Sequence, residues 1–199
     1  MQPRRPLGRG QPEHPSQSRR RLTERAMTLH SLEEIEAAVL RLARLIGASG
    51  TALPTFGHSD DGARPHVEVD ARGYHFVVVE RGQELERFTT GDLDALLCRV
   101  FESATFELAC GYELAHRVEG RDFRRLLFQH QVELLARLSP GWAEREAADH
   151  ARILQAHPFD DASEARVRLA VELQGGGHTP DAAWARASER YPLPQPEGS

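Results

Sequence analysis

The segment from Arg64 to Thr90 constrains the fold more than any other part of this chain. It holds three runs in which apolar and polar residues alternate, and the two junctions between the runs are Ala71-Arg72-Gly73 and Glu80-Arg81-Gly82. Alternation with a period of two is typical of β-strands, and a short junction that ends in glycine is typical of a hairpin turn. The segment therefore predicts three antiparallel strands connected as a meander.

The register of these strands decides which side chains share a face. We expect three-residue turns, each a type I turn followed by a left-handed glycine, so that Asp70 lies opposite Tyr74 and Val79 lies opposite Gln83. One face then carries the apolar residues Val67, Val69, Val77, Val79 and Leu85. The other face carries carboxylates and aromatic rings: Glu68, Asp70, Tyr74, Phe76, Glu84, Glu86 and Phe88. The first face is predicted to be core, and the second is the candidate partner-binding surface.

Helical patterns lie on both sides of this segment. Ser31 and Glu34 form a capping box for a helix over residues 32–46, and Gly47 ends it. Apolar residues at helical spacing predict further helices over about 92–118, 122–138, 140–157, 162–173 and 180–191, with Thr89 or Thr90 as the cap of the first. The long helix over 92–118 is expected to pack on the valine face. The predicted fold class is α+β and helix-dominated: a helix, a three-stranded antiparallel meander, and a helical C-terminal half.

The formal net charge of −5 is unevenly distributed along the chain. Residues 1–26 contain seven arginines and two glutamates, so the rest of the chain carries −10. The first 26 residues are rich in proline, glycine, serine and glutamine, which predicts a disordered basic tail; Met27 is an alternative start of the protein. Residues 27–194 are expected to form a single domain, followed by a disordered end over 195–199.

No pattern in the sequence predicts a catalytic, cofactor-binding or metal site. Glu113 and His116 match a Glu-x-x-His metal motif, but the second copy that such sites need is missing, and a helix-end pair with Arg117 is the simpler interpretation. His58, Asp60 and Asp61 lie in a long loop over 48–65, where they are expected to form turns rather than to bind a metal. Cys98 and Cys110 are predicted to be buried free thiols on one helix.

Nucleic-acid and membrane partners are not expected. Arg121, Arg124 and Arg125 form a small basic cluster, but in a part of the chain with a net charge of −10 they indicate a solvated helix start. No run approaches the roughly 20 apolar residues of a membrane span. Without a signal peptide or a disulfide framework, the cytoplasm is the expected compartment.

Several segments of the chain resemble the immunity protein 63 family of bacterial polymorphic toxin systems. The resemblance extends from Leu32 to Pro194 and rests on Leu53–Gly57, Pro65–Asp70, Gly73–Gly82, Glu84–Arg87, Val100–Ser103 and Trp142. It implies a small cytoplasmic protein, encoded beside a secreted toxin, that binds the toxin domain and neutralises it. It assigns no binding residue and no toxin class.

Two alternative functions remain compatible with the sequence. An acidic secretion chaperone that holds an effector segment shares the small size, the acidity and the start of helix and three strands. A helical metalloenzyme built around Glu113 and His116 is the other alternative. An immunity protein differs from the chaperone in its target, because it binds a folded toxin domain rather than an unfolded export segment.

Overall fold

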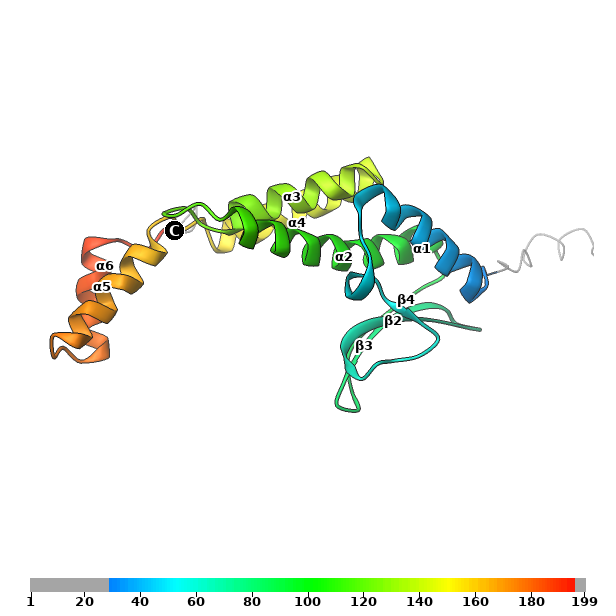
Figure 1. Ribbon diagram of the computed structural model, residues 1–199, viewed down its shortest axis with the longest axis horizontal. Coiled ribbons are helices and arrows are strands. Elements are labelled where there is room, and N and C mark those ends of the chain that lie inside the picture. The colour runs from blue at the N-terminus through cyan, green and yellow to red at the C-terminus, as the bar shows by residue number, and fades with distance from the viewer. Residues whose placement is uncertain (1–28, 196–199) are drawn as a thin grey trace, which may run out of the picture.

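Figure 1 shows the computed structural model of the protein, which describes residues 29–195. In order, the elements of this part of the chain are α1 (Leu32–Ile46), the 3-10 helix η2 (Gly50–Ala52), β1 (Thr55–Phe56), β2 (Gly62–Asp70), β3 (Gly73–Glu80), β4 (Gln83–Thr90), α2 (Leu93–His116), α3 (Arg124–Ala136), α4 (Pro140–Ala156), α5 (Ser163–Gly175) and α6 (Pro180–Arg190). The helix-dominated α+β class is confirmed. The predicted basic tail, and most of the predicted C-terminal end, lie outside the described residues.

The sheet has the order β1-β2-β3-β4, one strand more than predicted. The additional strand β1 is two residues long and pairs in parallel with β2, with Thr55 opposite His66. The segment 48–65, expected to be one long loop, therefore contains regular secondary structure: η2, β1 and the start of β2. The antiparallel meander of β2, β3 and β4 is as predicted.

The predicted register of the meander is wrong. Asp70 pairs with Gly73 instead of Tyr74, and Glu80 pairs with Gln83, so both turns contain two residues instead of three. In the second turn, Arg81 and Gly82 both have positive φ angles, of 51° and 74°, as a type I′ turn requires. Shortening the first turn shifts β3 by one residue along β2, and this moves every side chain of β3 to the opposite face.

This shift exchanges members between the two predicted faces. Pairing places Val67 opposite Phe76, Val69 opposite Tyr74, and Phe76 opposite Phe88. The inner face, which lies toward the helices, therefore carries Val67, Val69, Tyr74, Phe76, Val78, Glu86 and Phe88. The outer face carries His66, Glu68, Asp70, His75, Val77, Val79, Glu84, Arg87 and Thr89. An irregularity between Val78 and Val79 leaves Leu85 without a pairing partner, and its side chain is 57% exposed.

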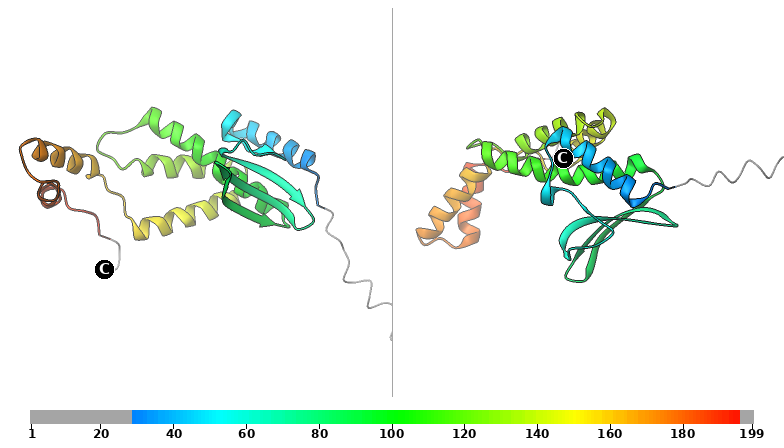
Figure 2. Two further views of the ribbon diagram at one scale, coloured as in Figure 1. Left: turned by 90° about the horizontal axis from the view of Figure 1, so that it is seen from below. Right: turned by 45° about the vertical axis from the view of Figure 1, so that its right-hand side comes forward.

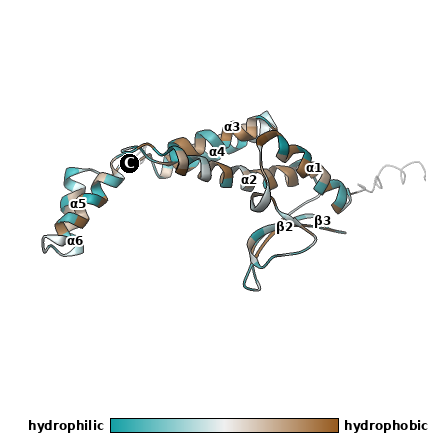
Figure 3. Cartoon of the chain, in the orientation of Figure 1, coloured by the Kyte–Doolittle hydropathy of each residue, from teal (hydrophilic) through white to brown (hydrophobic). Residues whose placement is uncertain are grey.

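The main core lies between the inner face of the sheet and α1–α4. Its largest fully buried side chains include Ile35 from α1, Phe76 from β3, Leu96 and Phe101 from α2, and Leu135 from α3. Trp142 of α4 stacks on Phe101 with ring centroids 6.0 Å apart. Figure 3 shows that apolar and polar residues alternate along α1–α3, as expected for helices that bury one side.

The helix boundaries follow from local signals. α1 has the predicted bounds, and its capping box is present: Ser31 Oγ accepts from the Glu34 N–H, and the Glu34 carboxylate accepts from the Ser31 N–H. The predicted cap of α2 is wrong, because Asp92 rather than a threonine accepts from the Asp94 N–H. Thr90 instead accepts from the Asp92 N–H and holds the connection to α2.

The helical hairpin of α5 and α6 lies at the far end of the molecule from the sheet (Figure 1). Its two helices pack mainly on each other, through Ala170, Ala183 and Ala187. Figure 1 and the right-hand view of Figure 2 show the sheet and the hairpin on the same side of α2. The molecule is therefore an arch, with α2–α4 as its span and an open concave side below α2.

Candidate partner-binding surface

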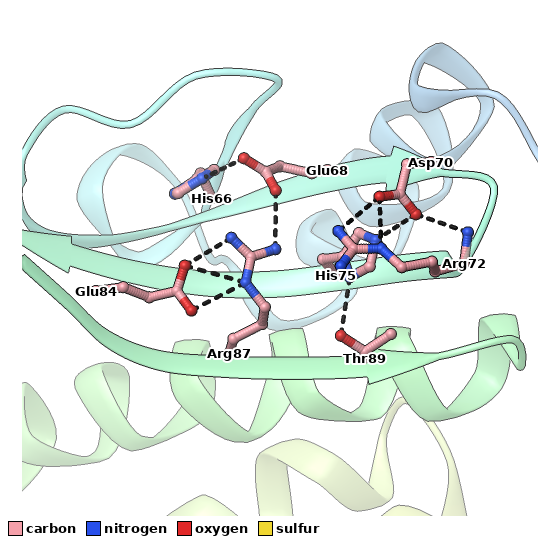
Figure 4. A network of polar contacts seen from close by, with 8 residues as sticks. All are labelled: His66, Glu68, Asp70, Arg72, His75, Glu84, Arg87 and Thr89. Carbon is pink, nitrogen blue, oxygen red and sulfur yellow. Dashed lines mark hydrogen bonds and ion pairs between the residues drawn. The ribbon is translucent and has the colours of Figure 1, made fainter.

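The outer face of the sheet carries no covering helix among the described residues, and Figure 2 shows the helices on the other side. Two clusters of polar side chains cover this face instead (Figure 4). His66, His75 and Val77 form the base of this face and are only 3%, 1% and 1% exposed. The charged side chains of this face are therefore accessible to a partner, whereas His66, His75 and Val77 are buried.

Arg87 on β4 is the centre of the first cluster. Its guanidinium donates to both oxygens of Glu84, at 2.6 to 3.0 Å, and to Glu68 Oε2 at 3.1 Å. His66 Nε2 donates to the other oxygen of Glu68 at 3.1 Å, while His66 Nδ1 is buried and has no hydrogen-bond partner among the described residues. The chain Glu84–Arg87–Glu68–His66 therefore joins β4 to β2 across the face of β3.

Asp70 at the end of β2 is the centre of the second cluster. One carboxylate oxygen accepts from the Arg72 N–H at 2.7 Å and from His75 Nε2 at 2.8 Å, and the other accepts from the Arg72 guanidinium. His75 Nδ1 lies 2.8 Å from Thr89 Oγ1, so in the neutral ring it accepts from that hydroxyl. The cluster braces the β2–β3 turn against β4.

These contacts stabilise the charged forms of all three outer-face carboxylates. Hydrogen bonds from the Arg72 side chain and then from His75 hold the pKa of Asp70 well below its usual range. Hydrogen bonds from Arg87 lower the pKa of Glu84. Partial burial raises the pKa of Glu68, but hydrogen bonds from Arg87 and His66 outweigh it and the net shift is downward. Because each carboxylate already has a cationic or imidazole partner, this face offers less uncompensated negative charge than its sequence suggests.

The seven residues predicted to form one binding face are divided between two faces. Glu68, Asp70 and Glu84 lie on the outer face, whereas Tyr74, Phe76, Glu86 and Phe88 lie on the inner face. Tyr74 and Phe76 are only 2% and 1% exposed, so their rings belong to the core. Glu86 forms a bidentate ion pair with Arg99 of α2 at 2.7 to 2.9 Å. The prediction that these seven side chains share a surface is wrong, because it depended on the incorrect register.

A groove opens where the inner face of the sheet diverges from α2. Its volume is about 560 Å³, and it lies between Pro65, Phe76 and Val78 of the sheet and Ser103, Phe106 and Cys110 of α2. Arg99 also lines the groove, with its guanidinium carbon 4.7 Å from the centre of the Phe76 ring. The groove combines apolar walls with a few charged groups, as binding pockets commonly do.

Along α2, a row of apolar side chains continues from this groove. Phe106, Cys110 and Leu114 are spaced four residues apart, which places them on one helix face. Phe106 and Leu114 are 49% and 68% exposed. The helical pattern over 92–118 predicted the helix itself but did not predict this exposed row. The sequence did contain a signal for such a row, since α2 has more apolar residues than one face of a helix can hold.

The candidate metal ligands are engaged in other contacts. The Glu113 carboxylate accepts from Arg117 through two hydrogen bonds of 2.8 Å, as the alternative interpretation of this motif predicted. His116 Nδ1 donates to the carbonyl of Tyr112. Asp61 accepts from the Gly82 N–H, and Asp60 from Arg64, so these loop carboxylates brace turns. Among residues 29–195, no three His, Cys, Asp or Glu side chains are grouped to hold a metal ion.

Both cysteines are free thiols. Cys98 is buried as predicted, but Cys110 is partly exposed at the groove, so the prediction of full burial holds for Cys98 alone. Burial raises the pKa of the Cys98 thiol to about 12, and burial also raises the pKa of Cys110. Neither thiol is therefore activated as a nucleophile.

The structure defines a helix-dominated α+β protein that presents an open charged sheet face and an apolar groove. Comparison with known proteins shows one similarity: residues 70–152 match the family model of immunity protein 63. The resemblance inferred from the sequence is thus confirmed for the segment from the end of β2 to α4. No match was found among curated proteins or solved structures. In the described part of the chain, no helix is both long and apolar enough to cross a bilayer.

Proposed function

We propose that this protein is an immunity protein that binds a cognate toxin domain and thereby blocks its activity. The observation that carries the proposal is the match of residues 70–152 to immunity protein 63. These residues include β3, β4 and α2, which form most of the groove and part of the outer sheet face. The partner would be the toxin domain encoded by the neighbouring gene of a bacterial polymorphic toxin system, and the protein would act in the cytoplasm.

The proposed action is binding rather than catalysis. An inhibitor of this kind needs a stable surface with shape and charge complementary to its target. Of the seven residues predicted to bind the partner, Glu68, Asp70 and Glu84 lie on the open outer face. A cationic side chain of the toxin would contact them there. Tyr74, Phe76 and Phe88 would support the interface from below, because they hold the sheet on α2.

The test is neutralisation in cells combined with binding of purified proteins. Expression of the toxin domain alone should arrest growth, and co-expression of this protein should restore it. The purified proteins should form a complex on size-exclusion chromatography, with a dissociation constant in the nanomolar range or below, about −12 kcal/mol or tighter. An unrelated toxin domain is the control. Failure both to restore growth and to form a complex would falsify the proposal.

The same material distinguishes the chaperone alternative. An immunity protein should bind the folded toxin domain and leave the rest of the toxin polypeptide unbound. A secretion chaperone should bind an isolated, unfolded export segment and ignore the folded domain. Titration of each fragment separately by isothermal calorimetry decides between the two functions.

A further inference from the structure

We infer that the groove between the sheet and α2, extended by the row Phe106, Cys110 and Leu114, receives an apolar side chain carried by a basic segment of the toxin domain. This inference rests on the proposed function and deepens it, because it names the surface and the chemistry of the segment that binds there. We call the groove and the row together the α2 docking surface.

The row lies on a face of α2 that other parts of the protein cover over only half of its length. In the first half of α2, the residues Leu96, Arg99 and Ser103 lie on this face, where Leu96 is completely buried and Arg99 pairs with Glu86 of the sheet. In the second half, Phe106 and Leu114 are left 49% and 68% exposed. Single exposed apolar residues are normal on protein surfaces, but a continuous row that leads into a groove marks an interaction site.

The groove has room for more than one side chain of a partner. Its volume of about 560 Å³ lies within the range of known ligand pockets, about 300–1,000 Å³. Its walls come from rigid elements, since Phe76 is fully buried in the central strand β3 and Ser103 lies in the middle of α2. A preformed site of this kind avoids much of the entropy cost of ordering its own side chains on binding.

The charges at the rim favour a cation. Arg64 is already engaged, because it donates to Asp60 Oδ2 at 3.1 Å and to the carbonyls of Leu53 and Gly50. Arg99 is engaged by both oxygens of Glu86. Glu107 also lines the groove, and its hydrogen bond comes from the Thr51 hydroxyl at 3.1 Å; within residues 29–195 no arginine or histidine pairs with it. Among the residues that the structure describes, the one uncompensated charge at the rim is therefore negative.

The position of the docking surface suits a folded partner. The face of α2 that carries the row points to the same side as the sheet, because Phe106 and Cys110 line one groove together with Pro65 and Val78 of the sheet. The hairpin of α5 and α6 lies on this side too (Figures 1 and 2). A domain seated on the row would lie in the concave side of the arch, between the sheet and the hairpin.

Two other occupants are less suitable. The basic segment over residues 1–26 of this chain contains no aromatic residue and few aliphatic ones, so it lacks an anchor for the groove. A second copy of this chain would bring another acidic surface toward Glu107. The partner that combines positive charge with an apolar anchor is the one that complements the site.

The test uses three single variants of the full-length protein and two matched controls. Leu114→Arg and Phe106→Arg place a charge on the exposed row, and Glu107→Arg reverses the charge at the rim. Leu45→Arg is the control for the first two, since Leu45 is 58% exposed on α1 and lies outside the groove. Glu144→Arg is the control for Glu107→Arg, because it makes the same change in net charge at an exposed position on α4. All five should melt as the wild type does.

The readout is binding to the purified toxin domain encoded by the neighbouring gene. Leu114→Arg and Phe106→Arg should weaken binding at least about 10-fold, as truncation of interface anchors typically does. Glu107→Arg should slow association at low salt and lose this effect at high salt. Both controls should bind as the wild type does. In addition, the bound toxin should slow the alkylation of Cys110 by a maleimide.

Each outcome has a defined meaning. If the wild type binds the toxin domain and the three variants bind it equally well, the inference that the toxin binds the α2 docking surface is overturned, and the proposed function stands. If the wild type itself fails to bind, the proposed function is overturned and this inference with it. If the wild type self-associates and Leu114→Arg abolishes self-association without changing toxin binding, the occupant is a second copy, and the inference is overturned.

Discussion

At the scale of single residues, the sheet depends on a few positions that admit only one kind of side chain. Gly73, which pairs with Asp70 at the β2–β3 turn, has a φ angle of 135°. A Cβ atom at this position would lie 2.4 Å from the carbonyl oxygen of Thr90 on the adjacent strand. Both the backbone conformation and the close approach of β4 therefore require glycine.

Replacing this glycine should destabilise the protein. We expect Gly73→Ala to lower the free energy of unfolding by more than about 1 kcal/mol, since the added methyl group forces β3 and β4 apart. Gly82→Asn is the control, because Gly82 has a φ of 74°, a Cβ atom there would meet no other atom within 4 Å, and asparagine tolerates this conformation. Urea denaturation of both variants tests the prediction. Equal stability of the two variants would contradict it.

Asp161 makes stability depend on pH. Hydrogen bonds from the Arg125 side chain and from the Asp122 N–H lower its pKa to about 2, from an ordinary value of 3.8. A depressed pKa in the folded state means that the stabilisation is present above about pH 4 and is lost as the pH falls to about 2. Asp161→Asn should therefore lower the Tm near neutral pH and lose this effect toward pH 2. A Tm difference between Asp161→Asn and the wild type that stayed constant over this pH range would refute the assignment.

At the scale of elements, α2 organises the molecule. The sheet packs on its first half, and α3 runs beside it. The inner face of the sheet contributes Val67, Tyr74 and Phe76 to this packing, each at most 2% exposed. The register of the two hairpins decides that aromatic rings, rather than only valines, face the helix.

The observed register can be tested by comparing substitutions at Phe76 and Leu85. Phe76→Ala should lower the free energy of unfolding by about 3–5 kcal/mol, because it leaves a cavity between β3 and α2. Leu85→Ala should change it by no more than about 0.5 kcal/mol, because Leu85 is exposed at the irregularity of β4. The three-residue turns expected from the sequence predict the reverse order, with Leu85 in the core. Chemical denaturation ranks the two variants.

At the scale of the whole molecule, hydrogen bonds and a buried ion pair hold the α5–α6 hairpin to the rest of the arch. Asp122, before α3, accepts from the Asp160 N–H at 2.8 Å, and Asp161 accepts from the Asp122 N–H. Arg166 of α5 is 1% exposed and pairs with Asp160 at 2.6 and 3.0 Å. It also donates to the carbonyls of Tyr191 and Pro192, beyond α6. We propose that these contacts make residues 29–195 a single domain.

Removal of Arg166 should release the hairpin before it affects the sheet. Arg166→Met leaves Asp160 and two carbonyls without their donor, and losing one partner of a buried pair typically costs about 3–5 kcal/mol. Because α5 and α6 pack mainly on each other, we expect amide hydrogen exchange to accelerate in residues 160–191 while β3 and α2 keep their protection. Arg168→Met is the control, since within residues 29–195 Arg168 pairs only with the exposed Glu119. Uniform acceleration across the chain would show that the hairpin is not a separate cooperative unit.

The sequence alone determined the features that depend on local signals. The class, the three-stranded meander and the bounds of α1 were predictable, because capping residues, glycine and hydrophobic periodicity act over a few positions. The later helices were located to within a few residues for the same reason. The similarity to immunity protein 63 was also visible in the residues themselves, and the family model confirms it over 70–152.

Tertiary structure decided the register and, with it, the site. A glycine at the third position of each junction is compatible with both a two-residue and a three-residue turn, and only the packing of Tyr74 and Phe76 on α2 selects the shorter one. β1 is too short to leave a periodic signal, and its partner lies eleven residues away. The neutralisation of Glu68, Asp70 and Glu84, and the exposure of Phe106 and Leu114, depend on which elements meet. Contacts between elements distant along the chain arise from three-dimensional packing, which local sequence patterns do not encode.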